Sequence, residues 1–200
     1  MSSTIALRER KKDATKAALA DAALDLADKY GLAQLRIEDI ADKAGVSLRT
    51  FRNYFPNKEA AVVGILTHNY DLVVRALRDR PDDEELWVAL AHACEALYPT
   101  DPDRAWGRRM RLLKAEPALA AEKYRSEATA LQALAEQIGK RSKCDSGSEV
   151  YPRFAAEVTQ AALRAAIDYW LDTPQTPPLR QVVWDFISRI CIKQAPAGDL

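Results

Sequence analysis

The stretch Gly45-Val46-Ser47-Leu48-Arg49-Thr50-Phe51-Arg52-Asn53-Tyr54-Phe55-Pro56-Asn57-Lys58 predicts a turn, a short helix and the start of a longer helix. Ser47 is a good N-cap, because its hydroxyl can accept a hydrogen bond from a free amide of the first turn. Pro56 cannot continue a helix, so the short helix ends after about two turns. With about 3.6 residues per turn, Phe51 and Phe55 share one side of it. The opposite side carries Arg49, Arg52 and Asn53. A helix this short is not stable alone, so we expect the two Phe side chains to be buried and the polar side to face a partner.

The residues before Gly45 predict a helix that supports the short one. Ile37, Ile40, Ala41 and Ala44 recur at helical spacing. Gly45 suits the left-handed turn that often ends a helix. Residues 37–55 therefore predict helix, turn and helix, the order in which a second helix can enter the major groove of DNA. The alternative is a helical hairpin that binds no DNA.

This region resembles the TetR family of bacterial regulators, over roughly residues 15–65. The matching segments are Ile37-Glu38-Asp39-Ile40-Ala41, Ala44-Gly45-Val46-Ser47, Thr50-Phe51, Tyr54-Phe55 and Asn57-Lys58-Glu59. The resemblance implies a surface that contacts bases and phosphates, made by Arg36, Ser47, Leu48, Arg49, Thr50, Arg52, Asn53, Tyr54 and Lys58. Within that surface, Tyr54 and Lys58 are expected to hold the DNA backbone. Arg36 stands where the family pattern usually has Thr, and Arg can reach a phosphate but cannot cap a helix.

The charge of the 200-residue chain is unevenly distributed. Its formal net charge is zero and 48 % of its residues are hydrophobic, a globular composition. Residues 1–58 carry 11 Lys and Arg against 8 Asp and Glu, a net charge of +3. The other 142 residues therefore carry 18 against 21, a net charge of −3. This division favours DNA binding through the N-terminal part, because the acidic remainder repels phosphate.

Metal, cofactor and membrane functions find no support in the sequence. Cys94, Cys144 and Cys191 have no CxxC spacing, and His68 and His92 belong to no ligand motif. No Ser/His/acid order or phosphate loop suggests an enzyme. We therefore expect no cofactor and no metal. We also expect a cytoplasmic protein, since there is no signal-peptide core and no apolar run of about 20 residues.

Prolines divide the chain into helix-length segments that are nearly free of glycine, so the fold is predicted to be all-α with about nine helices. Met1–Asp13 is expected to be a mobile basic arm that contacts DNA, or else a solvated tail. A helix from Thr15 to Tyr30 would complete a three-helix DNA-binding domain, residues 1–56. Residues 57–200 would form a ligand-binding and dimerisation domain, with the segment 141–149 as a mobile loop. Its predicted helices are Asn57–Arg80, Asp83–Tyr98, Asp103–Glu116, Pro117 to about Arg141, Pro152–Asp172 and Leu179–Lys193.

The last two predicted helices carry more apolar surface than one face needs. Their spacing resembles the dimerising helix pair of the TetR fold, and the apolar positions include Phe154, Val158, Ala161, Ala165 and Tyr169. We expect a homodimer with an interface made by Leu163, Ile167, Trp170, Val183, Phe186, Ile187 and Ile190. A two-fold dimer would read an inverted-repeat operator. The alternative is burial of these residues within one protomer.

The middle helices are predicted to hold an apolar effector pocket. The expected lining residues are Leu66, Tyr70, Trp87, Leu90, Cys94, Trp106, Arg109, Met110, Leu113 and Tyr124. The segment from Arg109 to Leu113, followed by Glu116-Pro117, resembles a TetR subgroup that includes the mycofactocin-system regulator. That resemblance implies an acyl-CoA-like ligand, with Arg108, Arg109 and Arg111 as candidates to hold its phosphates. The alternatives are a packed core and a solvated arginine face.

Together these features predict a dimeric DNA-binding transcriptional regulator, a repressor that an apolar or amphiphilic small molecule releases from DNA. An acyl-CoA is one candidate for that effector. The alternative is a constitutive DNA-binding or protein-docking factor without a ligand pocket.

Overall fold

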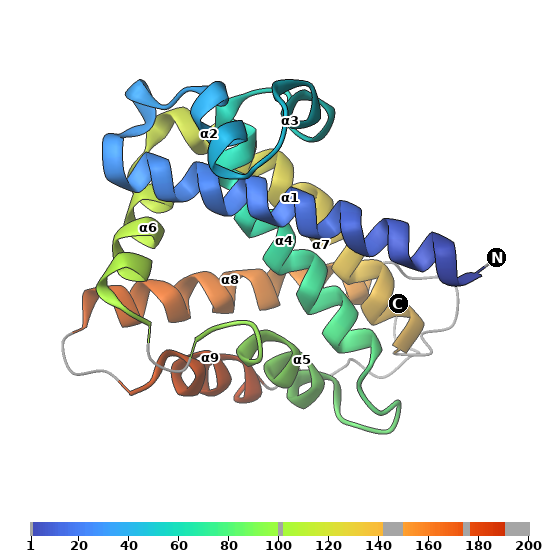
Figure 1. Ribbon diagram of the computed structural model, residues 1–200. Coiled ribbons are helices and arrows are strands. Elements are labelled where there is room, and N and C mark those ends of the chain that lie inside the picture. The colour runs from blue at the N-terminus through green and yellow to red at the C-terminus, as the bar shows by residue number, and fades with distance from the viewer. Residues whose placement is uncertain (1, 100–101, 142–149, 174–176, 191–200) are drawn as a thin grey trace. The chain divides into compact units, whose positions relative to one another are not determined.

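The computed structural model describes residues 2–99, 102–141, 150–173 and 177–190 (Figure 1). These residues form nine α-helices and two short 3-10 helices, without strands in the described ranges, which confirms the predicted all-α class. The chain forms two compact units. Unit 1 comprises Met1–Leu72 and Asp103–Ala130, and unit 2 comprises Val73–Pro102 and Leu131–Leu200. The boundary between them falls within α4 (Lys58–Arg78) and within α7 (Ala120–Arg141).

Unit 1 contains the predicted DNA-binding segment together with part of the second predicted domain. Its elements, besides the first parts of α4 and α7, are α1 (Ser2–Tyr30), η1 (Leu32–Gln34), α2 (Ile37–Lys43), α3 (Leu48–Tyr54), α6 (Arg104–Ala115) and η2 (Pro117–Leu119). One hydrophobic core joins them: Phe51 and Phe55 share it with Leu113 and Leu119. The division predicted at residues 56 and 57 therefore does not follow the compact units, because Leu113 and Leu119 come from the later segment.

Helix α1 is longer than the sequence suggested. We expected a mobile arm over Met1–Asp13, but the backbone is helical from Ser2 onward. The arm prediction was wrong because residues 2–13 contain neither Gly nor Pro and are rich in residues that favour helices, such as Ala, Leu, Arg, Lys and Glu. The helix ends at Tyr30, before Gly31, whose φ is 82°. That end agrees with the predicted one.

Unit 2 is built around α9 (Leu179–Ser188), which packs against both α5 (Leu86–Glu95) and α8 (Val150–Asp172) (Figure 1). Its buried side chains include Trp87, Leu90 and Cys94 from α5 and Val183 and Ile187 from α9. Helix α8 begins two residues before the predicted Pro152, which lies in its first turn where proline is tolerated. Helix α9 ends at Ser188, before the predicted end at Lys193. Residues 142–149 of the predicted mobile loop and residues 191–193 lie outside the described residues.

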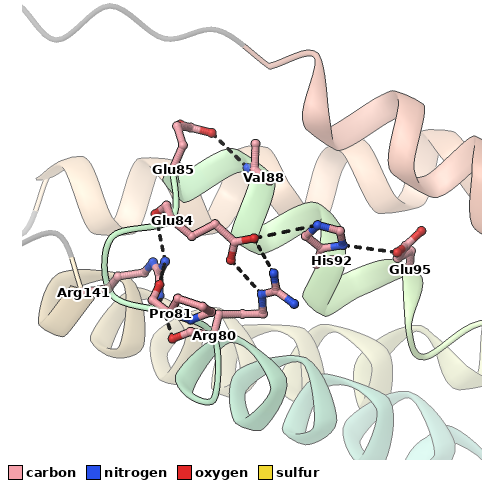
Figure 2. A network of polar contacts seen from close by, with 8 residues as sticks. All are labelled: Arg80, Pro81, Glu84, Glu85, Val88, His92, Glu95 and Arg141. Carbon is pink, nitrogen blue, oxygen red and sulfur yellow. Dashed lines mark hydrogen bonds and ion pairs between the residues drawn. The ribbon is translucent and has the colours of Figure 1, made fainter.

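A network of polar contacts holds the segment between α4 and α5 (Figure 2). Arg141 of α7 donates to the backbone carbonyls of Glu84 at 2.8 Å, Arg80 at 3.4 Å, and Pro81. Arg80 Nε donates to Glu84 Oε2 at 2.7 Å, and this contact holds the pKa of Glu84 below its usual value. Helix α5 begins at Leu86 because the Glu85 carboxylate accepts from the amide of Val88 at 2.9 Å. These contacts of Arg141 could not be predicted from its neighbours in the sequence.

Candidate nucleic-acid interface

Helix α3 begins with the cap that its sequence predicts. The Ser47 hydroxyl accepts from the backbone amide of Thr50 at 3.1 Å, and the backbone of Ser47 is extended, as an N-cap requires. Gly45 has a φ of 67°, so the turn before the helix uses the left-handed region that glycine adopts without strain. The predicted helix, turn and helix are confirmed as α2, the Gly45 turn and α3.

Two aromatic side chains anchor α3 to unit 1. Phe51 and Phe55 are 1 % and 4 % exposed, and their ring centroids lie 6.0 Å apart. Phe55 also lies against Gly64 of α4, where an added Cβ would come within 2.8 Å of the ring. Glycine at this position therefore allows α4 to approach the end of α3 closely.

The opposite face of α3 offers hydrogen-bond donors to solvent. Arg49, Arg52 and Asn53 are exposed, whereas Leu48, Thr50 and Tyr54 are half-buried on its flanks. A guanidinium group can bind O6 and N7 of guanine together, and an Asn side chain can bind N6 and N7 of adenine. This face can therefore read base edges if α3 lies in the major groove.

Arg36 occupies the N-cap position of α2 without capping it. No side-chain hydrogen bond is made there, and Arg36 Nε lies 3.7 Å from Glu38 in an exposed ion pair. This agrees with the expectation that Arg cannot replace a capping Thr. Glu38 and Asp39 occupy the first turn, where negative charge favours the helix dipole.

Lys58 has a structural position that the sequence did not reveal. Its ammonium donates to the carbonyls of Leu32 at 2.8 Å, Leu35 at 3.1 Å and Ala33 at 3.4 Å. An ammonium has three donors, so these contacts can employ all of them. A phosphate contact by Lys58 would therefore replace a bond that fixes the segment between α1 and α2.

Asp25 of α1 joins α2 to α6. It accepts from Lys43 of α2 and from Arg109 of α6, while Arg108 donates to Asp28 at 3.2 Å. The hydrogen bond from Lys43, followed by that from Arg109, lowers the pKa of Asp25 against the opposing effect of burial. Arg109 and Arg108, predicted as phosphate ligands of an effector, thus lie on an acidic stripe of α1.

The residues predicted to line an effector pocket fall in both units. Leu113 belongs to the hydrophobic core of unit 1, and Leu66 and Met110 pack against that core. Unit 1 also includes Tyr70, Trp106, Arg109 and Tyr124. Trp87, Leu90 and Cys94 are buried in unit 2. Tyr124 is 75 % exposed, so its assignment to an interior was wrong. Near Tyr124, Glu122 of α7 accepts a hydrogen bond at 3.0 Å from Asn57, which precedes α4, and the hydroxyl of Ser126 lies 2.7 Å from that of Thr67 of α4.

The predicted dimer residues divide into core and surface. Leu163, Val183 and Ile187 are buried within a single chain, where α9 packs against α8 and α5. Their assignment to an interface was therefore wrong. The half-buried members of the set are Ile167, Trp170, Phe186 and Ile190. The large apolar side chains that α8 leaves exposed are Val150, in its first turn, and Phe154 and Tyr169, which are 48 % and 47 % exposed. The Tyr169 ring lies 5.8 Å from that of Phe186.

Neither a metal cluster nor a membrane span occurs in the described parts of the chain. No three His, Cys, Asp or Glu side chains there are grouped to hold a metal ion. Among the helices described, none is both long and apolar enough to cross a membrane.

Helix α3 is capped, follows a tight glycine turn, is anchored by two phenylalanines and offers two arginines and an asparagine to solvent. These features define a DNA-binding protein of the helix-turn-helix class. Family models agree with this class: residues 19–62 match the bacterial regulatory proteins of the tetR family, and residues 84–193 match the MftR C-terminal domain. The chain belongs to the TetR family of transcriptional regulators, which are not enzymes.

Individual relatives match different lengths of the chain. The regulator RutR of Escherichia coli (strain K12) is 36 % identical over 80 residues, which are 40 % of this chain and 38 % of RutR. The regulator TcmR of Streptomyces glaucescens is 28 % identical over 172 residues, covering 82 % of this chain and 76 % of TcmR. The crystal structure of a transcriptional regulator from Rhodococcus sp. RHA1 shares the fold, with a TM-score of 0.54, 20 % identity, and coverage of 86 % of this chain and 93 % of that one.

Proposed function

We propose that this chain is a homodimeric transcriptional repressor that binds an inverted-repeat operator through α3 and is released by an apolar or amphiphilic small molecule. The observation that carries the proposal is the exposed face of α3, opposite the buried Phe51 and Phe55. Such a repressor acts where the bacterial chromosome lies, so the proposed location is the cytoplasm.

The proposed reading of DNA places α3 in the major groove. Arg49 and Arg52 supply bidentate donors to guanine, and Asn53 supplies a donor and an acceptor to adenine. Ser47, Thr50 and Tyr54 at the edges of the helix contact phosphates or sugars, which fix the position of the domain rather than its sequence preference. The neighbouring Arg36 adds a further phosphate contact from the start of α2.

The proposed dimer uses the exposed side of α8. Phe154, Ala161, Ala165 and Tyr169 follow one another at helical spacing, and all four are exposed. The two alanines allow a second helix to approach closely, while the aromatic rings at the ends offer large apolar area for burial. Two copies of this side can meet about a two-fold axis, which explains why an inverted repeat is expected.

The proposed effector enters among the apolar residues of the middle helices, and an acyl-CoA is the first compound to test. A phosphate head that bound Arg109 or Arg108 would have to displace Asp25 or Asp28 from it. An effector releases the protein only if it binds the DNA-incompetent state more tightly, and a preference of about 100-fold shifts the equilibrium by roughly 2.7 kcal/mol.

Two experiments test this function. Selection of duplexes from a random-sequence library should recover an inverted repeat, and light scattering should give a dimer that the Tyr169→Glu variant splits into monomers. Titration of the protein–operator complex with acyl-CoAs of increasing chain length, with CoA and the free acids as controls, tests the effector. A monomeric wild type, or selected sequences without two-fold symmetry, would contradict the proposal. Operator binding that no ligand class reverses would favour a constitutive DNA-binding factor.

A further inference from the structure

One carboxylate of α1 bonds to two other helices of unit 1 through different oxygen atoms. Asp25 Oδ2 accepts from Lys43 of α2, and Asp25 Oδ1 accepts from Arg109 of α6. Lys43 is the last residue of α2, and the Gly45 turn and α3 follow it. Because a carboxylate is planar, a partner that fixes one oxygen also fixes the direction of the other. The place of α6 and the end of α2 that leads into α3 therefore depend on the same side chain.

The ion pairs of Asp25 are partly shielded from solvent. The side chains of Asp25 and Arg109 are 33 % and 25 % exposed, and that of Lys43 is 42 % exposed. Exposed ion pairs contribute little because water and salt screen them, whereas partly buried pairs are screened less. The bridge is thus placed where its loss has a measurable effect.

Arg109 is held in an arrangement that leaves one of its donors unused. Its Nε is buried and has no hydrogen-bond partner in the described part of the chain. Its terminal nitrogens contact α1, through the bond to Asp25 and an approach of 3.8 Å to Asp21. A buried donor without a partner is unfavourable, so the contacts with α1 hold Arg109 against that cost. A movement of α6 that offered Nε an acceptor would compete with Asp25 for this arginine.

The neighbouring arginine contacts α1 without involving α2. Arg108 donates to Asp28 at 3.2 Å, so it also links α6 with α1. Among the described residues, Asp28 has no bond to α2. Arg108 and Arg109 therefore form the same kind of ion pair between the same two helices, and they differ in whether the carboxylate continues to α2.

We propose that Asp25 is a positioning residue that couples movement of α6 to DNA reading by α3. While Arg109 fixes one oxygen of Asp25, the other oxygen holds Lys43, and the end of α2 stays in place. A shift of α6 that withdraws Arg109 frees the carboxylate to turn, and the end of α2 loosens. Binding of DNA must then order a segment that the bridge had already ordered, so affinity falls. The inference rests on the DNA binding proposed above and holds for any effector that moves α6.

The test is a double-mutant cycle on the affinity of the full chain for the duplex recovered by selection. Arg109→Met and Lys43→Met each replace a cation by an unbranched apolar side chain. Arg109→Met alone should weaken binding roughly 2- to 30-fold, and by less than about 2-fold once Lys43→Met is present. Affinity for a random-sequence duplex of the same length should change less, because the bridge affects the placing of α3 against base edges.

Three variants separate this role from charge and from stability. Arg108→Met removes the same charge from the same helix, and its effect should be equal with and without Lys43→Met. Lys43→Arg keeps a donor for Asp25 and should preserve the wild-type response to Arg109→Met. Asp25→Asn removes the shared anion, so Lys43→Met should change operator affinity less in that background than in the wild type. This last comparison remains available if Arg109→Met proves poorly folded by circular dichroism.

Two results would overturn the inference while the proposed function stands. One is a loss from Arg109→Met that is the same with and without Lys43→Met, or, where Arg109→Met does not fold, a loss from Lys43→Met that Asp25→Asn leaves unchanged. The other is equal coupling of Arg108→Met to Lys43→Met. A wild type that selects no duplex would instead contradict the proposed function.

Discussion

Arg109 of α6 donates to Asp25 of α1, and the same carboxylate accepts from Lys43 of α2. One acidic side chain thus connects the first helix of the helix-turn-helix with a helix from the segment that matches the MftR C-terminal domain. Because all three residues belong to unit 1, the DNA-binding helices are not held independently of the later chain.

Replacing Asp25 by Asn should destabilise the protein by about 0.5–2 kcal/mol at pH 7, since it leaves Lys43 and Arg109 without their shared anion. The pKa of Asp25 lies below its ordinary value of 3.8, so its contribution is present above that pH and is lost as the pH falls further. Urea unfolding at several pH values should show the difference from wild type shrinking below pH 3.8. Asp21→Asn is the control, because Asp21 lies 3.8 Å from Arg109 and is 67 % exposed; an equal effect of both substitutions would contradict the assignment.

Replacing Arg36 by Thr should stabilise the protein by about 1 kcal/mol, because Arg36 has the extended backbone of an N-cap, with φ −113° and ψ 145°, but no capping bond. Conversely, Ser47→Ala removes the existing cap of α3 and should destabilise the protein by a similar free energy. Chemical denaturation measures both. If Arg36→Thr and Arg36→Ala have the same stability, Thr does not cap α2.

Gly64→Ala should destabilise the protein although alanine favours helices. An added Cβ would lie 2.8 Å and 2.9 Å from the Phe55 ring and 3.1 Å from Ala20 Cβ, and Phe55 is buried. Gly139→Ala is the control, since its Cβ would meet Pro152 at 3.6 Å, an ordinary contact. That control should gain about 0.5–1 kcal/mol from helix propensity. Increased stability of both variants would show that the packing of α4 against Phe55 does not need glycine at position 64.

Cys94 should be unreactive in the folded protein, because burial raises its pKa to about 12 and thus disfavours the thiolate. A Cys144→Ser/Cys191→Ser variant isolates this thiol. We expect no reaction with Ellman's reagent between about pH 7 and 9 until denaturant is added. Rapid labelling under native conditions would mean that the core around α5 opens readily.

The sequence predicted the features that depend on neighbouring residues. The Ser47 cap, the Gly45 turn, the burial of Phe51 and Phe55 and most helix boundaries follow from local spacing and capping chemistry. The helical start of α1 is equally local, since residues 2–13 contain no helix breaker, and the expectation of a mobile arm gave too much weight to their basic charge.

Contacts between segments far apart in the sequence could not be predicted from local patterns. Nothing near Lys58 indicates that its ammonium reaches carbonyls 23 to 26 residues earlier, and nothing near Asp25 indicates Arg109, 84 residues later. Likewise, Leu163 and Ile187 have the spacing of an interface as well as that of a core, and only the packing of α8 on α9 distinguishes the two.

The central claim is that the exposed face of α3 reads DNA, and the affinity of an Arg49→Ala/Arg52→Ala variant for the selected operator tests it most directly. Lys58 is left unchanged because its contacts with η1 and Leu35 are structural. Each lost base contact should cost roughly 1–3 kcal/mol on the operator, while affinity for a random duplex falls much less and unfolding is unaltered. Arg104→Ala/Lys140→Ala is the control for lost charge. A folded Arg49→Ala/Arg52→Ala protein that binds the operator as tightly as wild type, and still prefers it over random DNA, would contradict the account.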